Sequence, residues 1–163
     1  MPATGCQRIG LGFDVHAFAE GRRLVLGGVD IPFERGLDGH SDADVLAHAV
    51  MDALLGALRE GDIGKLFPDD DPAYAGADSI ELLRRVAALV RGRGWRIDDV
   101  DSVIALQAPK VAPYRKQMRA NIAAACGVGV EQVGVKATTT EHLGFEGRGE
   151  GASAQAVCLL SRG

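Results

Sequence analysis

The stretch Gly39-His40-Ser41-Asp42-Ala43-Asp44-Val45-Leu46-Ala47-His48 places two histidines and two aspartates at the start of a predicted helix. Upstream, Asp14 and His16 stand two residues apart, so on an extended strand their side chains point to the same side. His48 follows His40 by eight residues, about two helical turns, and returns near the same face. One carboxylate and two or three imidazoles can therefore converge on a point. Three such ligands with an open fourth position are typical of a catalytic zinc.

A structural interpretation of the same residues has to be weighed against the metal site. A single histidine near a helix start is more often a hydrogen-bonded surface or core residue than a ligand. Here three of the chain's four histidines fall in its first third, and two of them accompany an aspartate at strand or helix spacing. Spacing alone leaves the two interpretations about equally open.

Length and composition limit the class of protein. With 163 residues, 47% hydrophobic and 25% charged, the chain is expected to form one globular domain over residues 1–163. A net charge of −4 argues against a nucleic-acid partner. Cys6, Cys126 and Cys158 form no Cys-x-x-Cys pair, which fits a reducing compartment. Neither a signal peptide nor an apolar run of about 18 residues is present, so we expect a cytoplasmic protein without a membrane partner.

The order of apolar patterns predicts an α/β (α+β) fold with the element order β-β-α-α-β-α-β-β. Strands are expected at 8–18, 23–31, 100–107, 133–137 and 152–160. Helices are expected at 45–58, with Ser41 or Asp42 as N-cap, from the Asp78 cap to Gly92, and at 113–126. Residues 61–72 and 144–151 contain so many turn formers that we expect loops there.

Strands interleaved with helices favour one mixed sheet of the four-stranded type with helices on one face. The other face then needs a cover. Residues 103–106 and 154–160 are apolar enough to predict that another subunit provides it.

Polar residues late in the chain suit an anionic ligand. Thr138, Thr139 and Thr140 offer hydroxyl and backbone N–H groups to phosphate oxygens, although on these residues alone a β-branched strand that simply continues is the favoured explanation. Glu141 is an oxygen ligand suited to Mg²⁺ bound together with phosphates. Arg148, between glycines, is either a phosphate ligand or an exposed loop residue. No Walker motif and no Gly-x-Gly-x-x-Gly after a strand occurs.

Six stretches between residue 8 and about residue 160 share the order and spacing of one enzyme family. They are Gly12–His16, His40–Asp44, Gly61–Pro68, Gln107–Lys110, Lys136–Glu141 and Gly144–Gly151. Through them the chain resembles the 2-C-methyl-D-erythritol 2,4-cyclodiphosphate synthases of the non-mevalonate pathway of isoprene and terpenoid biosynthesis.

The resemblance implies a phosphorus–oxygen lyase that acts on 4-diphosphocytidyl-2-C-methyl-D-erythritol 2-phosphate. In such an enzyme the 2-phosphate attacks the β-phosphorus, CMP leaves, and a cyclic diphosphate forms. The family resemblance also implies a homotrimer whose sites lie between subunits, with the zinc side from one subunit and much of the cytidine pocket from its neighbour. An apolar cavity on the threefold axis, with Phe145 and Arg148 at its mouth, is implied as a place for an isoprenoid diphosphate.

The same resemblance implies roles for individual residues. Asp14, His16 and His48 would hold one Zn²⁺ per subunit, and Glu141 would bind Mg²⁺ or Mn²⁺ with the diphosphate. His40 and Thr139 would act on the transition state, and His40 with Ser41 would orient the phosphates. The remaining implied substrate contacts are Val15, then Asp62, Ile63, Gly64, Phe67, Pro68, Asp69, Asp70 and Asp71 around the methylerythritol, and Leu106, Gln107, Ala108, Pro109, Lys110, Val111, Ala112, Thr138 and Thr140 around the cytidine.

Two departures and two rival functions accompany the resemblance. Ala43 stands where the family often has glycine, and Val111-Ala112 where it has larger apolar residues. One rival is a zinc-dependent phosphohydrolase that uses metal-bound water. The other is a non-enzymatic trimer with structural zinc, but such zinc usually has four protein ligands. The sequence offers no convincing fourth, since His142 is the only spare histidine.

Overall fold

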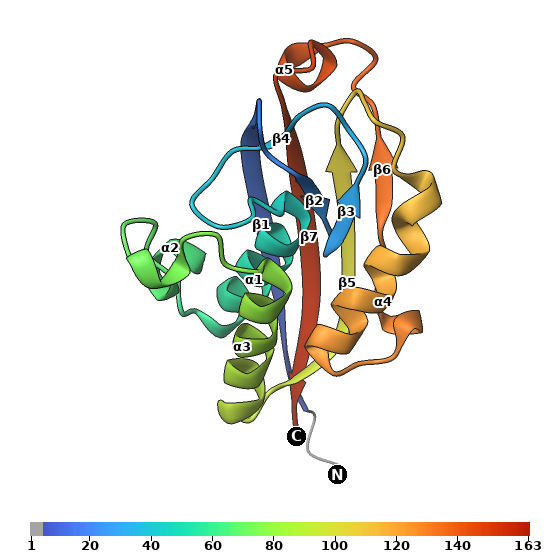
Figure 1. Cartoon of the computed structure of the whole chain (residues 1–163). Helices are drawn as coiled ribbons and strands as arrows, with labels where there is room; N and C mark the ends of the chain where they lie inside the picture. Colours follow the sequence, from blue (N-terminus) through green and yellow to red (C-terminus); the bar gives the residue numbers. More distant parts are fainter. Residues whose placement is uncertain (1–4) are drawn as a thin grey trace.

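A pair of long antiparallel strands forms the centre of the computed structural model, which describes residues 5–163. These strands are β1 (Cys6–Ala19) and β7 (Gly151–Arg162), paired from Cys6↔Arg162 to Ala17↔Gly151. β5 (Arg96–Ala105) lies antiparallel to β7, β6 (Lys136–Thr138) lies parallel to β5, and β4 (Gly36–Leu37) pairs with the other edge of β1. The result is a mixed sheet in the order β4-β1-β7-β5-β6 (Figure 1).

The predicted mixed sheet is confirmed, but its strand number was wrong. The sheet has five strands, because the chain after residue 31 adds the two-residue β4 beside β1. A strand this short has no period-2 pattern that a sequence reading could detect.

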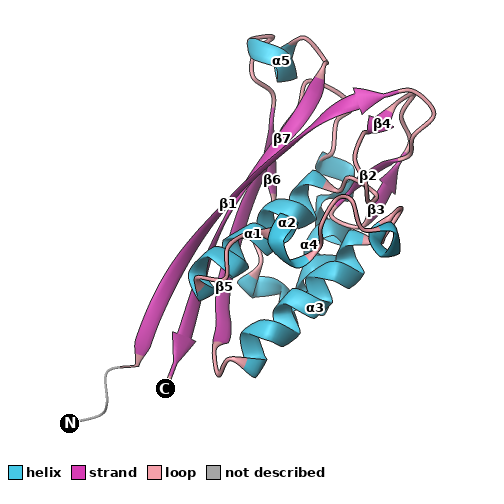
Figure 2. Cartoon of the chain, turned by 90° about the vertical axis from the view of Figure 1, so that its left-hand side faces the viewer, coloured by secondary structure: helices cyan, strands magenta, loops and turns pink. Residues whose placement is uncertain are grey.

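Three helices cover one face of the sheet, as predicted (Figure 2). They are α1 (Val45–Leu58), α3 (Ser79–Gly92) and α4 (Arg115–Cys126). α1 lies directly against β1 and β7 and is buried along nearly its whole length, while α3 packs between α1 and α4. This sheet-on-helix layer forms the hydrophobic core.

Two glycines on β1 allow α1 to approach the strand closely. A Cβ at Gly10 would lie 1.8 Å from the carbonyl oxygen of Ala53, and one at Gly12 would lie 1.9 Å from that of Ala49. Only glycine fits at these positions. Because the helix backbone rests on the strand here, His48 comes beside the polar residues of β1.

The predicted strand at 23–31 is instead a hairpin. β2 (Leu24–Leu26) and β3 (Val29–Ile31) pair across Gly27 and Gly28, whose φ angles are 55° and 73°. Two consecutive positive φ angles suit the tight turns of two-residue hairpins. Because the residues on both sides of the glycines are mostly apolar, their pattern predicted one continuous strand and not a turn.

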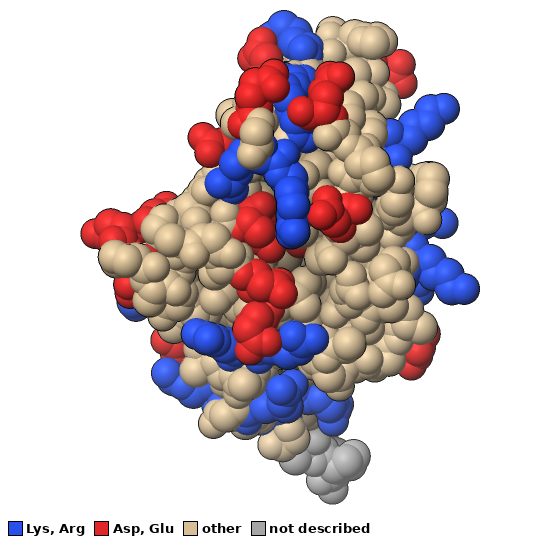
Figure 3. All heavy atoms as spheres, viewed as in Figure 1, with Lys and Arg blue, Asp and Glu red and all other residues tan. Residues whose placement is uncertain are grey.

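Both predicted loops contain short helices. Residues 61–72 include α2 (Ile63–Leu66) and the start of the 3-10 helix η1 (Pro72–Tyr74), and 144–151 includes α5 (Gly144–Gly147). Two of the aspartates that suggested a loop are N-caps: Asp62 accepts from the Lys65 N–H at 3.1 Å and Asp71 from the Ala73 N–H at 2.9 Å. Figure 3 shows acidic side chains gathered at the edge where α2 and the loop after it project.

The boundaries of other helices and strands differ from the predicted ones by a few residues. The N-cap of α1 is Asp44 and not Ser41 or Asp42. The strand expected at 100–107 begins at Arg96 and ends at Ala105, and the one expected at 133–137 is β6, because Val133 makes only an isolated bridge to Val100. Two further 3-10 helices are η2 (Ala112–Tyr114) and η3 (Val130–Gln132).

The sheet face opposite the helices is uncovered; it is mainly apolar along β1, whereas β5 presents Asp99 and Asp101 to it. Its largest side chains come from β1, where Ile9 is 74% and Leu11 69% exposed, and Val157 of β7 is 48% exposed. Alternate residues of 103–106 and 154–160 point to the helices, so these segments supply less of the open face than predicted. Within residues 5–163, every helix is too short or too polar to span a bilayer.

Candidate functional site

Asp14, His16 and His48 converge where β1 passes the first turn of α1. Asp14 Oδ2 lies 2.9 Å from His16 Nε2 and 3.1 Å from His48 Nδ1, and the two nitrogens are 3.2 Å apart. A tetrahedral zinc with bonds of about 2.0–2.1 Å separates its ligand atoms by about 3.3 Å. The three atoms therefore form a group, which we term the triad, of the size and chemistry that zinc requires.

Both imidazoles of the triad are fixed by contacts on their second nitrogen. His16 donates its Nδ1–H to the carbonyl of Asp38 at 2.7 Å, so Nε2 is the nitrogen that faces the triad. His48 Nε2 lies 2.9 Å from Ser79 Oγ and 3.1 Å from Ser41 Oγ. Such contacts orient metal-binding histidines in proteins.

The triad is electrostatically suited to a cation. Burial by itself would raise the pKa of Asp14, but hydrogen bonds and charges from His16 and His48 outweigh it and hold the pKa at about 2. Burial would lower the pKa of His16, yet its hydrogen bond and attraction to Asp14 raise it above the usual value. The carboxylate therefore stays ionised at neutral pH.

The triad lines a cavity of about 410 Å³. Four aspartates line this cavity, and no lysine or arginine is among its lining residues. A phosphate entering such a cavity is repelled unless bound cations offset the negative charge. Besides the triad, the lining residues are Gly39, His40, Ser41, Met51, Asp52, Asp62, Ile63, Gly64, Phe67, Asp69, Tyr74 and Leu82.

Asp52 is a lining residue to which sequence reasoning gave no role. Burial, and the nearby carboxylates of Asp14 and Asp62, raise its pKa to about 6 against an opposing hydrogen bond from the Ile63 N–H at 2.9 Å. That bond fastens the start of α2 to α1. The signal that could have pointed to Asp52 is its spacing of four residues from His48 on the same helix.

The implied phosphate and methylerythritol residues divide between the cavity and its rim. His40, half-buried, donates Nε2–H to the Asp71 carbonyl at 2.7 Å, and Phe67 packs edge-on against Tyr74 with ring centroids 5.2 Å apart. Pro68, Asp70 and Asp71 are not among the lining residues. Val15 points to the open sheet face, so only its backbone lies on the site side of β1.

The implied cytidine residues line a separate hollow of about 180 Å³. It lies at the ends of β5 and β6, and the Ala108–Pro109 peptide bond beside it is cis. Ala108 and Thr140 are not lining residues. Those that line it are Leu106, Gln107, Pro109, Lys110, Val111, Ala112, Ala137, Thr138 and Thr139.

Glu141 lines neither hollow, and it is a neighbour of Thr139 in the second one and not of the triad. It follows β6, is exposed, and donates its N–H to Thr139 Oγ1 at 3.3 Å. The triad is on β1, whereas this hollow is at β5 and β6, with β7 between them. The two lining sets share no residue. A single copy of the chain therefore does not unite the predicted halves of the site.

Three further residues from the sequence analysis are placed by the structure. Phe145 is half-buried on α5, which lies next to the start of β7 (Figure 1), and exposed Arg148 pairs with Glu150 at 2.7 Å. Ala43 is fully buried at φ 56°, a left-handed conformation that costs a non-glycine residue about 1 kcal/mol. Its N–H donates to Ser41 Oγ at 3.2 Å, which helps to hold the loop before α1.

Comparison with known sequences gives one family. The YgbB family matches residues 7–161. The chain is 60% identical over 156 residues to the 2-C-methyl-D-erythritol 2,4-cyclodiphosphate synthase of Thiobacillus denitrificans, covering 96% of this chain and 98% of that protein. It is 62% identical over 155 residues to the protein of the same name from Geotalea uraniireducens, covering 95% and 99%.

Comparison with solved structures indicates the same family. The fold is similar to part of the bifunctional IspDF of Campylobacter jejuni, with a TM-score of 0.94 and 42% identity over 98% of this chain; the match spans 43% of that longer chain. It is also similar to IspF of Plasmodium falciparum in complex with CDP, with a TM-score of 0.83 and 34% identity over 96% of each chain.

Proposed function

Because the chain belongs to the YgbB family of 2-C-methyl-D-erythritol 2,4-cyclodiphosphate synthases, we propose that it converts 4-diphosphocytidyl-2-C-methyl-D-erythritol 2-phosphate to the 2,4-cyclodiphosphate and CMP. Residues 1–163 would act as one synthase domain. The observation that carries the proposal is the triad, open to a cavity that is rich in carboxylates. Such a cavity accepts a diphosphate only together with divalent cations.

The proposed reaction exchanges one P–O bond for another. An oxygen of the 2-phosphate attacks the β-phosphorus, the bond from that phosphorus to the oxygen bridging the α-phosphate breaks, and CMP leaves with the bridging oxygen. No water is consumed. No strong base is required either, because a phosphate oxygen is already ionised at neutral pH. The task of the protein is therefore to position two anions and to neutralise them.

The described contacts support a division of roles. Asp14, His16 and His48 would hold Zn²⁺ and Glu141 would hold Mg²⁺ or Mn²⁺, and these ions supply the charge that offsets the phosphates. His40, held by its bond to the Asp71 carbonyl, and Ser41 would orient the phosphates.

Thr139 would join His40 in stabilising the transition state. Residues 62–64 and 67–71 would surround the methylerythritol, and residues 106–112 with 138–140 would surround the cytidine. The CDP complex of the Plasmodium falciparum relative is consistent with a cytidine pocket.

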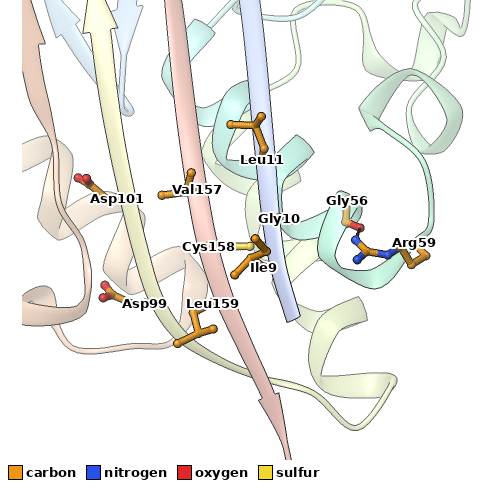
Figure 4. Close-up of a pocket in the computed structure, with 10 residues that line it drawn as sticks. All are labelled: Ile9, Gly10, Leu11, Gly56, Arg59, Asp99, Asp101, Val157, Cys158 and Leu159. Atoms are coloured by element: carbon orange, nitrogen blue, oxygen red, sulfur yellow. Dashed lines mark hydrogen bonds between the residues drawn. The ribbon is translucent and has the colours of Figure 1, made fainter. Parts of the chain in front are cut away.

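A complete site then requires a second copy of the chain, and we propose a homotrimer. The open sheet face carries a hollow of about 760 Å³ (Figure 4), lined by apolar side chains of β1 and β7. Arg59 lies on one side of it and Asp99 and Asp101 on the other. Opposite charges on the two sides suit head-to-tail contacts, which close into a ring when the rotation permits. That the ring has three members rests on the family resemblance.

Two smaller proposals rest on the resemblance and on cysteine usage. Phe145 and Arg148 would border an axial cavity that holds an isoprenoid diphosphate. We place the activity in the cytoplasm, because Cys6, Cys126 and Cys158 are all free thiols.

Incubation of the zinc-loaded protein with the cytidine diphosphate substrate and Mg²⁺ tests the function. Phosphorus NMR should show a cyclic diphosphate while CMP appears in equal amount. CMP without a cyclic product would favour the phosphohydrolase. No reaction from a folded, metal-loaded oligomer would overturn the enzymatic assignment.

His48→Ala separates a catalytic zinc from a structural one. We expect a folded assembly whose turnover falls by at least about 100-fold, because several kcal/mol of charge stabilisation are lost and each 1.36 kcal/mol is a factor of ten. Zinc content, circular dichroism and rate are measured together. His142→Ala is the matched control for zinc content, since His142 lies outside the triad. Unfolding of the His48→Ala protein would instead indicate structural zinc.

A further inference from the structure

We propose that Gln107 is a positioning residue that holds the turn from Thr140 to Leu143 and so couples occupation of the second hollow to the placement of Glu141. The proposed function gives Gln107 a part only in the cytidine pocket. The inference rests on the proposed function in one respect, namely that Glu141 binds a divalent cation that arrives with a diphosphate. It concerns the backbone of the turn and not the reaction itself.

The turn has a strained backbone. The Leu143 N–H donates to the Thr140 carbonyl at 3.0 Å and closes the turn, and Glu141 and His142 between them have φ angles of 54° and 63°. Two successive positive φ angles are typical of glycine, asparagine or aspartate. A glutamate and a histidine are both strained in this conformation. Such residues persist only where the surrounding contacts determine the backbone.

Contacts on two sides determine the backbone at His142. Gln107 Oε1 accepts the His142 N–H at 3.2 Å, from a segment 35 residues earlier in the chain. On the other side lies Gly147, where a Cβ would be only 2.2 Å from the carbonyl carbon of His142. Because Gly147 belongs to the same short stretch of chain as the turn, Gln107 is the contact that ties His142 to a distant element.

Gln107 belongs to the second hollow as well as to the turn. It is half-buried and lines the hollow of about 180 Å³. Its neighbour Leu106 donates its N–H to the Thr138 carbonyl at 3.1 Å. Residues 106 and 107 are therefore bonded to the chain on both sides of Glu141, at Thr138 and at His142. A ligand that immobilises these two residues also immobilises the backbone that carries Glu141.

Glu141 is suited to gain from this coupling. Its side chain is exposed, and within residues 5–163 it takes part in none of the ion pairs. Its carboxylate is therefore free to bind a cation held by phosphate oxygens. Mg²⁺ tolerates little deviation from octahedral geometry, so such a carboxylate must be well placed. Without the bond from Gln107, the turn can relax and move Glu141.

The test uses the zinc-loaded protein with CDP and Mn²⁺ as probes. Electron paramagnetic resonance gives the Mn²⁺ affinity with and without CDP, and calorimetry gives the CDP affinity with and without Mn²⁺. Each ligand must strengthen the other by the same factor. Gln107→Met keeps the length of the side chain and removes its strong acceptor. We expect Mn²⁺ binding in the presence of CDP to weaken by about 10- to 100-fold, the range for loss of an outer-shell contact.

The CDP affinity without Mn²⁺ should change little in Gln107→Met. Equal losses of CDP affinity with and without Mn²⁺ would mean that Gln107 is only a nucleotide contact, and would overturn the inference. Glu141→Gln should abolish the Mn²⁺ binding that depends on CDP. Binding that survives this substitution would also overturn the inference, because the turn would then present no ligand.

NMR of the protein without CDP reports the turn directly. In Gln107→Met the His142 amide should exchange faster with solvent, and the one-bond Cα–Hα couplings of residues 141 and 142, which report positive φ, should change. Gln107→Glu keeps an accepting oxygen and should keep the His142 amide protected. If Gln107→Met does not fold, Gln107→Ala removes the same acceptor and introduces no larger group. An unchanged turn would contradict the proposed role.

Gln117→Met is the matched control. Gln117 donates its Nε2–H to Asn121 Oδ1 at 2.8 Å on the exposed side of α4, so the same chemical change is made away from the turn. The turn and the Mn²⁺ affinity should stay as in the unmodified protein. Equal losses in Gln107→Met and Gln117→Met would overturn the inference.

His142→Gly tests the role of strain. Glycine adopts a positive φ freely, so the turn should then depend less on Gln107. In this background Gln107→Met should weaken Mn²⁺ binding much less than in the unmodified protein, and an equal loss in both backgrounds would count against the proposal. None of these measurements uses a substrate that can cyclise. Failure of the cyclisation assay therefore leaves this result standing, and failure here leaves the proposed reaction standing.

Discussion

His16 and His48 present different ring nitrogens to one carboxylate, and each ring is set by a contact on its far side. Strand spacing predicted that Asp14 and His16 lie together, but it left open whether His40, His48 or both join them. The family resemblance singled out His48, and the structure places it there. The sequence could not predict the contact between Ser79 and His48. The two residues are 31 positions apart in the sequence, and a serine at the start of a helix is common. Nor could it predict the Asp38 carbonyl, since a backbone acceptor leaves no mark in a sequence.

Protons should compete with zinc at the triad. Asp14 raises the pKa of His16, so this ring is protonated at a higher pH than a free imidazole. Below that pKa, we expect the zinc affinity to fall by about tenfold per pH unit for each proton displaced. Zinc titrations in metal buffers between about pH 6 and pH 8 measure how steeply the zinc affinity changes with pH.

The substitution Asp14→Asn provides the comparison. It removes the charge that raises the pKa of His16. Zinc should therefore bind more weakly at neutral pH, and the pH below which the zinc affinity falls should be lower than in the unmodified protein. A zinc affinity that does not change over this pH range in the unmodified protein would show that His16 is not a ligand.

Close contact between β1 and α1 holds the triad together at the scale of elements. Gly12→Ala would place a Cβ 1.9 Å from the Ala49 carbonyl oxygen, so the helix must move. We expect a loss of stability of about 1–3 kcal/mol or more, typical of overpacking. Zinc binding should weaken too, because His48 moves away from Asp14. Chemical denaturation and zinc titration measure the two effects.

Gly56→Ala is the matched control on α1. A Cβ at Gly56 would find its nearest atom, the Leu11 carbonyl oxygen, at 3.7 Å. This is ordinary contact, and alanine favours a helix by about 1 kcal/mol over glycine. The protein should be unchanged or more stable. If Gly12→Ala behaves in the same way, the close approach is not what positions His48.

Prediction from sequence worked for long elements and failed for short ones. The three long helices and the long strands β1, β5 and β7 carry enough residues to show a period. The hairpin at residues 24–31 depends on a distant residue, because Asp44 accepts from the Gly27 N–H at 2.9 Å and from the Gly28 N–H at 2.8 Å. Tertiary contacts of this kind decide short elements, and local composition does not record them.

Assembly through the open sheet face can be tested on the whole molecule. Leu11→Glu puts a charge at the centre of that face, where the side chain is 69% exposed in the single chain. We expect a folded monomer, since little of the chain's own core is touched, with strongly reduced cyclisation because each site would draw on two copies. Light scattering measures the oligomeric state, and the product assay measures the rate of cyclisation.

Val130→Glu is the control for this change. Val130 is 44% exposed on η3, outside the open sheet face, so assembly should persist. Full activity from a Leu11→Glu monomer would contradict a site shared between copies.

The pairing of β1 with β7 also has a mechanical consequence. Cys6 and Arg162 are register partners at one end of the ladder, while His16 pairs with Ala152 near the other. Tension applied between residues 6 and 162 loads the hydrogen bonds one after another, so the ladder should unzip at low force. Tension between residues 6 and 151 loads them all in shear and should require much more. Single-molecule pulling would distinguish the two, and in the unzipping geometry the bonds around the triad are the last of the ladder to break.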